Sequence, residues 1–212
     1  ALIGPYLNER SILGGWTTRY DGRIQTKNVY EAINERYPDN NFLFANGSSV
    51  LGIEQKAMAE KYNMPILYSC HPRSRNRLVA SGFKLDPRVI QHEPLGFHDY
   101  NCLQMNAFAV VSDSGTLPEE SSFFTSVGHS FPAVCIRTST ERPEALDKGC
   151  FILAGIDEKG LLQAVDTAVP MVREGDYGIP VPDYVEENVS TKVVKIIQSY
   201  TGVVDKMVWR KY

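Results

Sequence analysis

The fold class is decided by residues 107–120, which read Ala107-Phe108-Ala109-Val110-Val111-Ser112-Asp113-Ser114-Gly115-Thr116-Leu117-Pro118-Glu119-Glu120. The apolar run at 107–111 is typical of a strand that is buried on both faces, as in a parallel sheet. The small polar residues at 112–115 then mark a turn, and a helix is predicted from about Pro118. This stretch therefore predicts a strand–turn–helix unit of the kind from which α/β domains are built.

The same alternation of short apolar strands and helices extends in both directions from this unit. Strands are predicted at 66–70, 89–92, 107–111, 132–136 and 151–153. Helices are predicted at 53–62, 75–81, 98–106, from 118, and at 143–146, 158–172 and 189–200. We expect a polar turn at 71–74, Gly82 as a helix end, and a helix at 158–172 that Pro170 shortens. The pattern predicts an α/β fold: a Rossmann-like parallel sheet with helices on both faces.

Residues 1–58 show a weaker pattern. Lys27 to Arg36 predicts an amphipathic helix and Asn41 to Ala45 a strand, while Gly47-Ser48-Ser49 predicts a turn. The segment is either an additional α/β unit or a remnant of another domain. We therefore divide the chain into an unassigned segment at 1–58, a ligand-binding domain at 59–188 and a C-terminal helix and tail at 189–212.

The bulk properties exclude several classes of protein. The net charge of −3 and pI of about 5.8 argue against a nucleic-acid partner. The four cysteines form no C-x-x-C pair, so we expect them to be reduced and mostly buried, in a cytoplasmic setting. No apolar run approaches the roughly 18 residues that span a bilayer, and no signal peptide is predicted. The histidines have no metal-ligand spacing, so we expect neither a metal nor a cofactor.

The turn at 112–116 is the strongest candidate for a binding site. A helix that begins directly after a buried strand presents free N–H groups and the positive end of its dipole, which suits a diphosphate. Gly115 allows the backbone to approach, Ser114 adds a hydroxyl donor, and Asp113 is expected to cap the helix. Glu120, one turn later, can accept from both hydroxyls of a ribose. The alternatives are an ordinary N-cap and a solvated helix face.

Three further clusters also follow predicted strands, where ligands bind in open parallel sheets. Arg137 and Arg142 flank three hydroxyl residues, a combination that suits phosphate but also fits a charged loop before a capped helix. Tyr100 can stack on a base, although aromatic residues at this spacing are more often part of a core. His71 is either a phosphate donor or a structural histidine.

Together these clusters resemble the bacterial non-hydrolysing UDP-N-acetylglucosamine 2-epimerases. Their spelling is closest to the branch of UDP-2-acetamido-2,6-dideoxy-L-talose 2-epimerases, which make UDP-N-acetyl-L-fucosamine for capsule and O-antigen. The resemblance covers about residues 59–212, and four segments carry it: Tyr68 to Ser74, Glu93 to Tyr100, Ser112 to Glu120 and Ile136 to Ala145.

The resemblance implies a glycosyltransferase-B-type arrangement, in which this chain contains the C-terminal of two Rossmann-like domains. Ser114 and Gly115 would hold the diphosphate, Glu120 the ribose, Arg142 the phosphate end and Tyr100 the uracil. The helix at 189–200 would pack back across the two domains, and a homodimer is implied. Most of the acidic residues credited with proton transfer lie in the other domain of the family, so the catalytic residues stay unassigned.

The activity that the resemblance implies is inversion at C2 of a UDP-N-acetylhexosamine. UDP leaves by anti-elimination, a 2-acetamidoglycal forms, and UDP adds back with C2 inverted. Two alternatives stay open. One is a domain that binds a UDP-sugar without turning it over, and the other is a glycosyltransferase of the same architecture.

Overall fold

The computed structural model describes residues 41–47, 52–92 and 95–211. Six parallel strands form one sheet in the order β3-β2-β1-β4-β5-β6. This confirms the predicted Rossmann-like parallel sheet. The strands are β1 (Leu43–Gly47), β2 (Ile66–Cys70), β3 (Val89–His92), β4 (Ala109–Ser112), β5 (Ala133–Cys135) and β6 (Ile152–Leu153).

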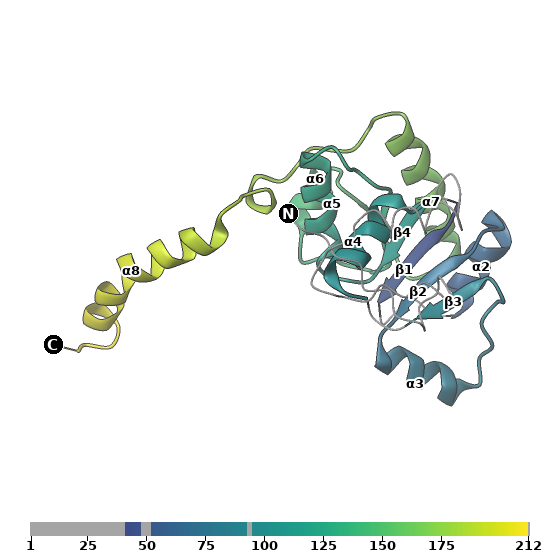
Figure 1. The fold of residues 1–212 in the computed structure, drawn as a ribbon, viewed down its shortest axis with the longest axis horizontal. Coiled ribbons are helices and arrows are strands. Elements are labelled where there is room, and N and C mark those ends of the chain that lie inside the picture. The colour runs from purple at the N-terminus through teal and green to yellow at the C-terminus, as the bar shows by residue number, and fades with distance from the viewer. Residues whose placement is uncertain (1–40, 48–51, 93–94, 212) are drawn as a thin grey trace, which may run out of the picture.

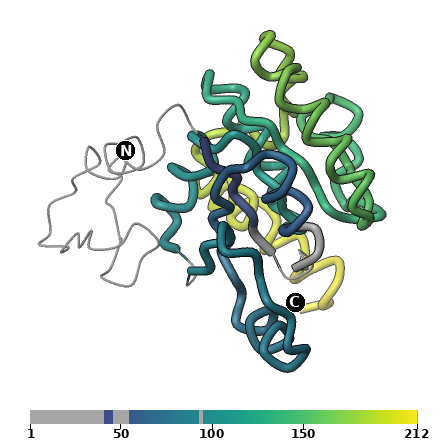
Figure 2. Tube along the Cα trace, turned by 90° about the vertical axis from the view of Figure 1, so that its right-hand side faces the viewer, coloured from purple at the N-terminus to yellow at the C-terminus, as the bar shows by residue number. Residues whose placement is uncertain are grey.

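The described helices alternate with the strands along the chain (Figure 1). Their bounds are α2 (Gly52–Tyr62), α3 (Pro72–Ser81), α4 (Phe97–Asn106), α5 (Leu117–Ser126), α6 (Pro143–Asp147), α7 (Glu158–Arg173), a 3-10 turn η2 (Pro182–Tyr184) and α8 (Val189–Met207). In Figure 2, α3 (blue) lies at the bottom of the view and α7 (green) at the upper right.

Helices cover both faces of the sheet, as the side chains of β4 illustrate. Val110 packs in an apolar cluster with residues of α4, α5 and α6, whereas Ala109 and Val111 pack in a second cluster with residues of α2 and α7. Successive side chains of a strand point to opposite faces, so a run of apolar residues is needed where both faces are buried. The predicted helices on both faces are therefore confirmed.

The first turn of α3 differs from the prediction of a polar turn at 71–74. The helix begins at Pro72, because Nδ1 of His71 accepts a hydrogen bond from the N–H of Arg73 at 3.2 Å and caps it. Proline is tolerated at the first helical position, where its missing N–H has no partner to lose. Gly82 ends the helix with φ of 66°, as predicted.

Pro170 does not shorten α7, contrary to the prediction. The helix runs from Glu158 to Arg173, and it is anchored at its start by Asp157, whose side chain accepts from the N–H of Gly160 at 2.8 Å. Proline removes one backbone hydrogen bond. Buried Ala168 and Val169 directly precede Pro170, and half-buried Val172 follows it, so packing keeps the last turn helical.

The sheet also contains residues from before position 59. The predicted strand at 41–45 appears as β1, which lies in the middle of the sheet and pairs with both β2 and β4. The following helix α2 packs on the same face as α7. The boundary expected at residue 59 thus falls inside α2. The predicted helix at 27–36 and the turn residues Ser48 and Ser49 lie outside the described residues.

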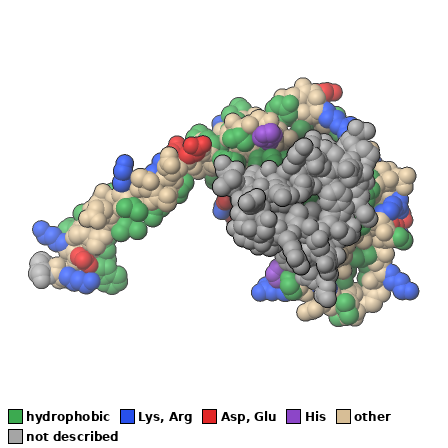
Figure 3. All heavy atoms as spheres, viewed as in Figure 1, with side chains coloured by type: hydrophobic (Ala, Val, Ile, Leu, Met, Phe, Trp, Pro, Cys, Tyr) green, Lys and Arg blue, Asp and Glu red, His purple; other side chains and the backbone are tan. Residues whose placement is uncertain are grey.

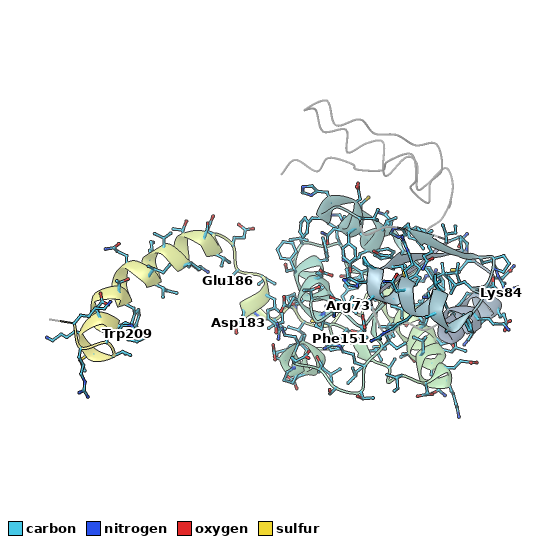
Figure 4. All side chains as sticks on the ribbon, turned by 90° about the horizontal axis from the view of Figure 1, so that it is seen from below. Arg73, Lys84, Phe151, Asp183, Glu186 and Trp209 are labelled. Atoms are coloured by element: carbon cyan, nitrogen blue, oxygen red, sulfur yellow. The ribbon has the colours of Figure 1, made fainter. Side chains whose placement is uncertain are left out.

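The last helix, α8, extends away from the sheet (Figure 1). It continues to Met207, beyond the predicted end at Tyr200, and none of its residues is buried. Apolar side chains run along it (Figure 3), and Trp209 lies beyond its far end while Glu186 lies near its start (Figure 4). The expectation that this helix packs back across the fold is therefore not met within the described residues. No helix in this described part of the chain combines the length and apolarity that crossing a membrane requires.

Candidate functional site

The carboxyl ends of the parallel strands lie at one edge of the sheet, and the strand order reverses between β1 and β4. Ligands of open parallel sheets bind in the crevice outside the carboxyl ends at such a switch point. Ser112, the last residue of β4, is in register with Asn46 of β1. The residues that follow Ser112 therefore stand directly at the switch point.

The helix α5 begins immediately behind this point. Its N-cap is Thr116, and no side chain caps it. The prediction that Asp113 caps the helix is wrong, because the chain makes a further turn through Ser114 and Gly115 before Leu117 starts the helix. The helix start is thus left without a side-chain acceptor, and its dipole is positive towards the crevice.

Hydroxyl groups organise the turn itself. The N–H of Ser114 donates to Oγ of Ser112 at 3.0 Å, and the N–H of Thr116 donates to Oγ of Ser114 at 3.3 Å. Oγ of Ser114 also bonds Oγ1 of Thr116 at 2.9 Å. The N–H of Gly115 makes no hydrogen bond to a described residue. Such a turn can give backbone and hydroxyl donors to an anion.

The loop after β5 lies against this turn. A Cβ atom on Gly115 would stand 4.0 Å from Oε2 of Glu141, so the side chain of Glu141 reaches the turn. From the same loop, Nε of Arg142 donates to Oε1 of Glu119 at 2.6 Å, which joins the loop to the first turn of α5. The structure therefore brings Gly115, Ser114 and Arg142, three of the predicted site residues, into one cluster.

Ion pairs set the electrostatics of this loop. Glu119 raises the pKa of Arg142 above its usual value, so the guanidinium is charged at any physiological pH. Nη1 of Arg137 donates to Oε2 of Glu141 at 2.5 Å. The backbone N–H of Glu141 itself and the Arg137 guanidinium lower the pKa of this carboxyl group. Both predicted arginines are thus held by carboxylates at the carboxyl edge of the sheet.

Glu120 is half-buried in the first turns of α5 and is bound by a residue of α4. Nε2 of Gln104 donates to its Oε2 at 2.9 Å. One turn earlier on α4, the half-buried ring of Tyr100 packs edge-on against Phe44, with ring centroids 5.3 Å apart. Tyr100, Gln104 and Glu120 therefore form a second cluster along the α4 side of the site. Tyr100 also packs against the core cluster, as the alternative interpretation of this aromatic residue predicts.

His71 lies at the end of β2, one strand from β1 on the other side of the switch point. Its side chain is exposed, and its Nδ1 atom is the cap of α3 described above. His71 therefore has a structural role in this structure, as the cap of α3. Its position after a strand keeps it at the same edge as the other predicted residues.

The cysteines are all free, and three of them are buried. Burial raises the pKa of Cys135 to about 11 and that of Cys102 to about 11, so neither supplies a thiolate at neutral pH. Within the described ranges, no three side chains of histidine, cysteine, aspartate or glutamate are grouped as metal ligands. An open pocket of about 250 Å³ adjoins the site, and it is lined by Ile136, Arg137, Thr138, Ser139, Glu141 and Ile156.

Two residues of these clusters were not predicted from the sequence. Glu119 is adjacent to the predicted Glu120, and nothing in the local pattern distinguishes which of the two meets Arg142. Gln104 carried a usable signal, because it lies at the spacing of Tyr100, Leu103 and Ala107 on the buried face of a helix. A glutamine among apolar residues at that spacing indicates a buried amide with a specific partner.

The strand order, the two-faced covering and the helix start at the switch point define the class: an open parallel α/β domain of the Rossmann type. A sequence model described as UDP-N-acetylglucosamine 2-epimerase matches residues 50–198. The match covers most of the sheet domain and half of α8. The chain belongs to the UDP-N-acetylglucosamine 2-epimerase family.

Individual proteins show the same relation. A UDP-N-acetylglucosamine 2-epimerase of Methanococcus maripaludis is 34% identical over 113 residues, which are 51% of this chain and 30% of that protein. The structure of the Rickettsia bellii enzyme matches with a TM-score of 0.70 and 29% identity over 85% of this chain and 54% of that one. The Methanocaldococcus jannaschii enzyme, solved with UDP-GlcNAc and UDP, shares the fold at a TM-score of 0.62 and 24% identity, over 82% and 49%. The chain thus spans about half of these solved structures.

Proposed function

We propose that this chain binds the UDP part of a UDP-N-acetylhexosamine and forms the nucleotide-binding part of a UDP-sugar 2-epimerase. The observation that carries the proposal is the uncapped start of α5 at the β1/β4 switch point, with Arg142 held beside it by Glu119. A diphosphate needs such a combination of helix start and guanidinium. The Methanocaldococcus jannaschii protein, which shares the fold, was solved with UDP-GlcNAc and UDP.

In this proposal the two clusters divide the nucleotide between them. Ser114, Gly115 and Arg142 hold the diphosphate, and Arg137 strengthens the positive field of the loop. Glu120 accepts from the ribose hydroxyls, and Tyr100, one turn before Gln104 on α4, contacts the uracil. His71 borders the crevice from the β2 side, where its ring supports binding in addition to capping α3.

The proposed chemistry is inversion at C2 by elimination and re-addition of UDP. Cleavage of the C1–O bond leaves negative charge on the departing diphosphate, and preorganised donors lower the barrier by stabilising that charge. The backbone donors of the α5 turn and Arg142 do this work. A general base that removes the C2 proton is also needed, and no residue of this chain is assigned to that role.

The finer assignment of the substrate rests on the amino-acid sequence of two segments. Ser112 to Thr116 and Ile136 to Thr140 favour the UDP-2-acetamido-2,6-dideoxy-L-talose 2-epimerase branch. With it comes a role in the synthesis of capsule and O-antigen polysaccharides. We propose this branch, without a metal or cofactor, and with residues 59–188 as the core of the UDP-binding unit, 189–212 as a C-terminal helix and tail, and a homodimer as the assembly.

Two other functions would use the same crevice. A domain that binds a UDP-sugar without turning it over needs only the two clusters described. A glycosyltransferase of the same architecture would transfer the sugar to an acceptor. Product analysis separates the three: a C2 epimer, no reaction, or acceptor-dependent release of UDP.

The test is a calorimetric titration of the chain with UDP, followed by NMR detection of exchange at C2 of a UDP-N-acetylhexosamine in D₂O. Saturable binding of UDP supports the proposal, and exchange at C2 locates the base within this chain. Binding without exchange means that this chain binds the nucleotide and that it does not supply the base for C2. Absence of UDP binding overturns the proposed function.

A further inference from the structure

A buried glutamine on α4 contacts a half-buried carboxylate near the start of α5. The side chain of Gln104 is 0% exposed, and its Nε2 atom donates to Oε2 of Glu120 at 2.9 Å. Leu103 and Ala107, which flank it along the chain, lie in the core cluster of that face, while Asp99 and Asn101 are the other buried polar residues of the helix. Asn101 donates to the carbonyl of Phe97 in its own helix, whereas the fully buried amide of Gln104 reaches a carboxylate of another helix.

The other end of the same amide shows that this arrangement is costly for folding. Oε1 of Gln104 is buried and makes no hydrogen bond to a described residue. A buried carbonyl without a partner destabilises the fold, and an apolar side chain of similar volume would avoid this cost. Packing alone therefore does not explain why a glutamine that contacts Glu120 stands at this position.

The geometry at Glu120 indicates what the contact with Gln104 does. Gln104 fixes Oε2, while Oε1 makes no hydrogen bond within the described part of the chain. A carboxylate that is held by one oxygen keeps the other in a fixed direction and available as an acceptor. The amide is also neutral, so this contact is not an ion pair. The adjacent Glu119, by contrast, is neutralised by Arg142.

We propose that Gln104 is a positioning residue that orients Glu120 for the hydroxyls of the ribose and so makes the site select a ribonucleotide. The proposal rests on the proposed UDP site. Without the amide, the Glu120 side chain would sample several rotamers, and part of the binding free energy would be lost in ordering it. The loss should fall on the ribose hydroxyls and leave the diphosphate contacts intact.

The experiment compares binding of UDP with binding of its 2′,3′-dideoxy analogue, which lacks both ribose hydroxyls. Gln104→Met conserves volume and removes the donor. We expect it to weaken UDP about 5- to 20-fold, the range for a hydrogen bond to a charged group that is lost in part, and to leave the analogue unchanged. Gln163→Met, on the exposed side of α7, is the matched control and should change neither affinity.

A double-mutant cycle with Glu120→Gln then asks whether Gln104 acts through Glu120. In the Glu120→Gln background, Gln104→Met should have no further effect on UDP. A persistent effect, or equal losses for UDP and the analogue in the single variant, would overturn the proposal while leaving the UDP site standing. A wild-type chain that binds neither ligand overturns the proposed function itself. If Gln104→Met does not fold, Gln104→Asn, whose amide is too short to reach, gives the same comparison.

Discussion

Replacing Arg142 by methionine tests the proposed diphosphate site most directly. Methionine keeps much of the apolar stem and removes the guanidinium. Of the five N–H groups of a guanidinium, one on Nε is donated to Glu119 and one on Nη1 to the carbonyl of Glu141, at 2.6 and 3.1 Å. Three of the five are left for a ligand. The ion pair with Glu119 also fixes the direction in which they point.

The expected magnitude follows from the number and environment of these donors. Hydrogen bonds to a charged group are worth about 1.5–3 kcal/mol. The side chain of Arg142 is 36% exposed, so solvent screening places the effect in the lower half of that range. We therefore expect UDP binding to weaken by about 1.5–2 kcal/mol, which is roughly 10- to 30-fold.

Calorimetry at two salt concentrations measures this change, and the difference between the variant and the wild type should shrink at high salt. Arg173→Met is the matched control. Arg173 lies over the ring of Phe108 at 5.0 Å, at the opposite edge of the sheet, because Phe108 precedes β4. An Arg142→Met chain that is folded and binds UDP with wild-type affinity would refute the assignment.

Three further predictions concern other parts of the molecule. Glu120→Gln should weaken UDP but spare inorganic pyrophosphate, and equal losses in calorimetry would contradict its ribose role. Gly160→Ala should lower the unfolding free energy in urea by about 1–3 kcal/mol, because its Cβ would lie 2.6 Å from a backbone oxygen; Gly202→Ala, with nothing within 4 Å, is the control that should not. Arg88 lowers the pKa of Asp86 to about 2. The stability that Asp86 contributes should therefore be complete above its unfolded pKa of about 4 and lost as pH falls through about 2. A stability difference between wild type and Asp86→Asn that stays constant over that range would contradict this.

The fold was largely predictable because each strand is a short apolar run that is buried on both faces. Residues 66–70 and 89–92 appear as strands with the predicted bounds. The errors occur where a side chain or a packed face overrides the local signal. A histidine cap extends α3 by three residues, and the buried face of α7 carries that helix past Pro170.

The site was predictable in its backbone parts and less so in its pairings. Ser114 and Gly115 predict a turn before a helix. The strand before them places that turn at the carboxyl edge of the sheet. That Arg142 meets Glu119 depends on how the loop after β5 approaches the first turn of α5, which lies 23 residues earlier in the chain. Such approach distances are set by packing between β4 and β5, which no local pattern encodes.

The carboxylates of this edge bear on where proton transfer takes place. Three of them accept from a side-chain donor of this chain: Glu119 from Arg142, Glu120 from Gln104, and Glu141 from Arg137. A general base works best with a pKa near the operating pH, whereas the pKa of Glu141 is lowered. We therefore expect these three groups to act in binding and the base for C2 to approach from the sugar end of the substrate. In an NMR assay of proton exchange at C2, Glu141→Gln should leave the exchange rate at saturating substrate unchanged. If the variant loses exchange but keeps its affinity for UDP, Glu141 is the base.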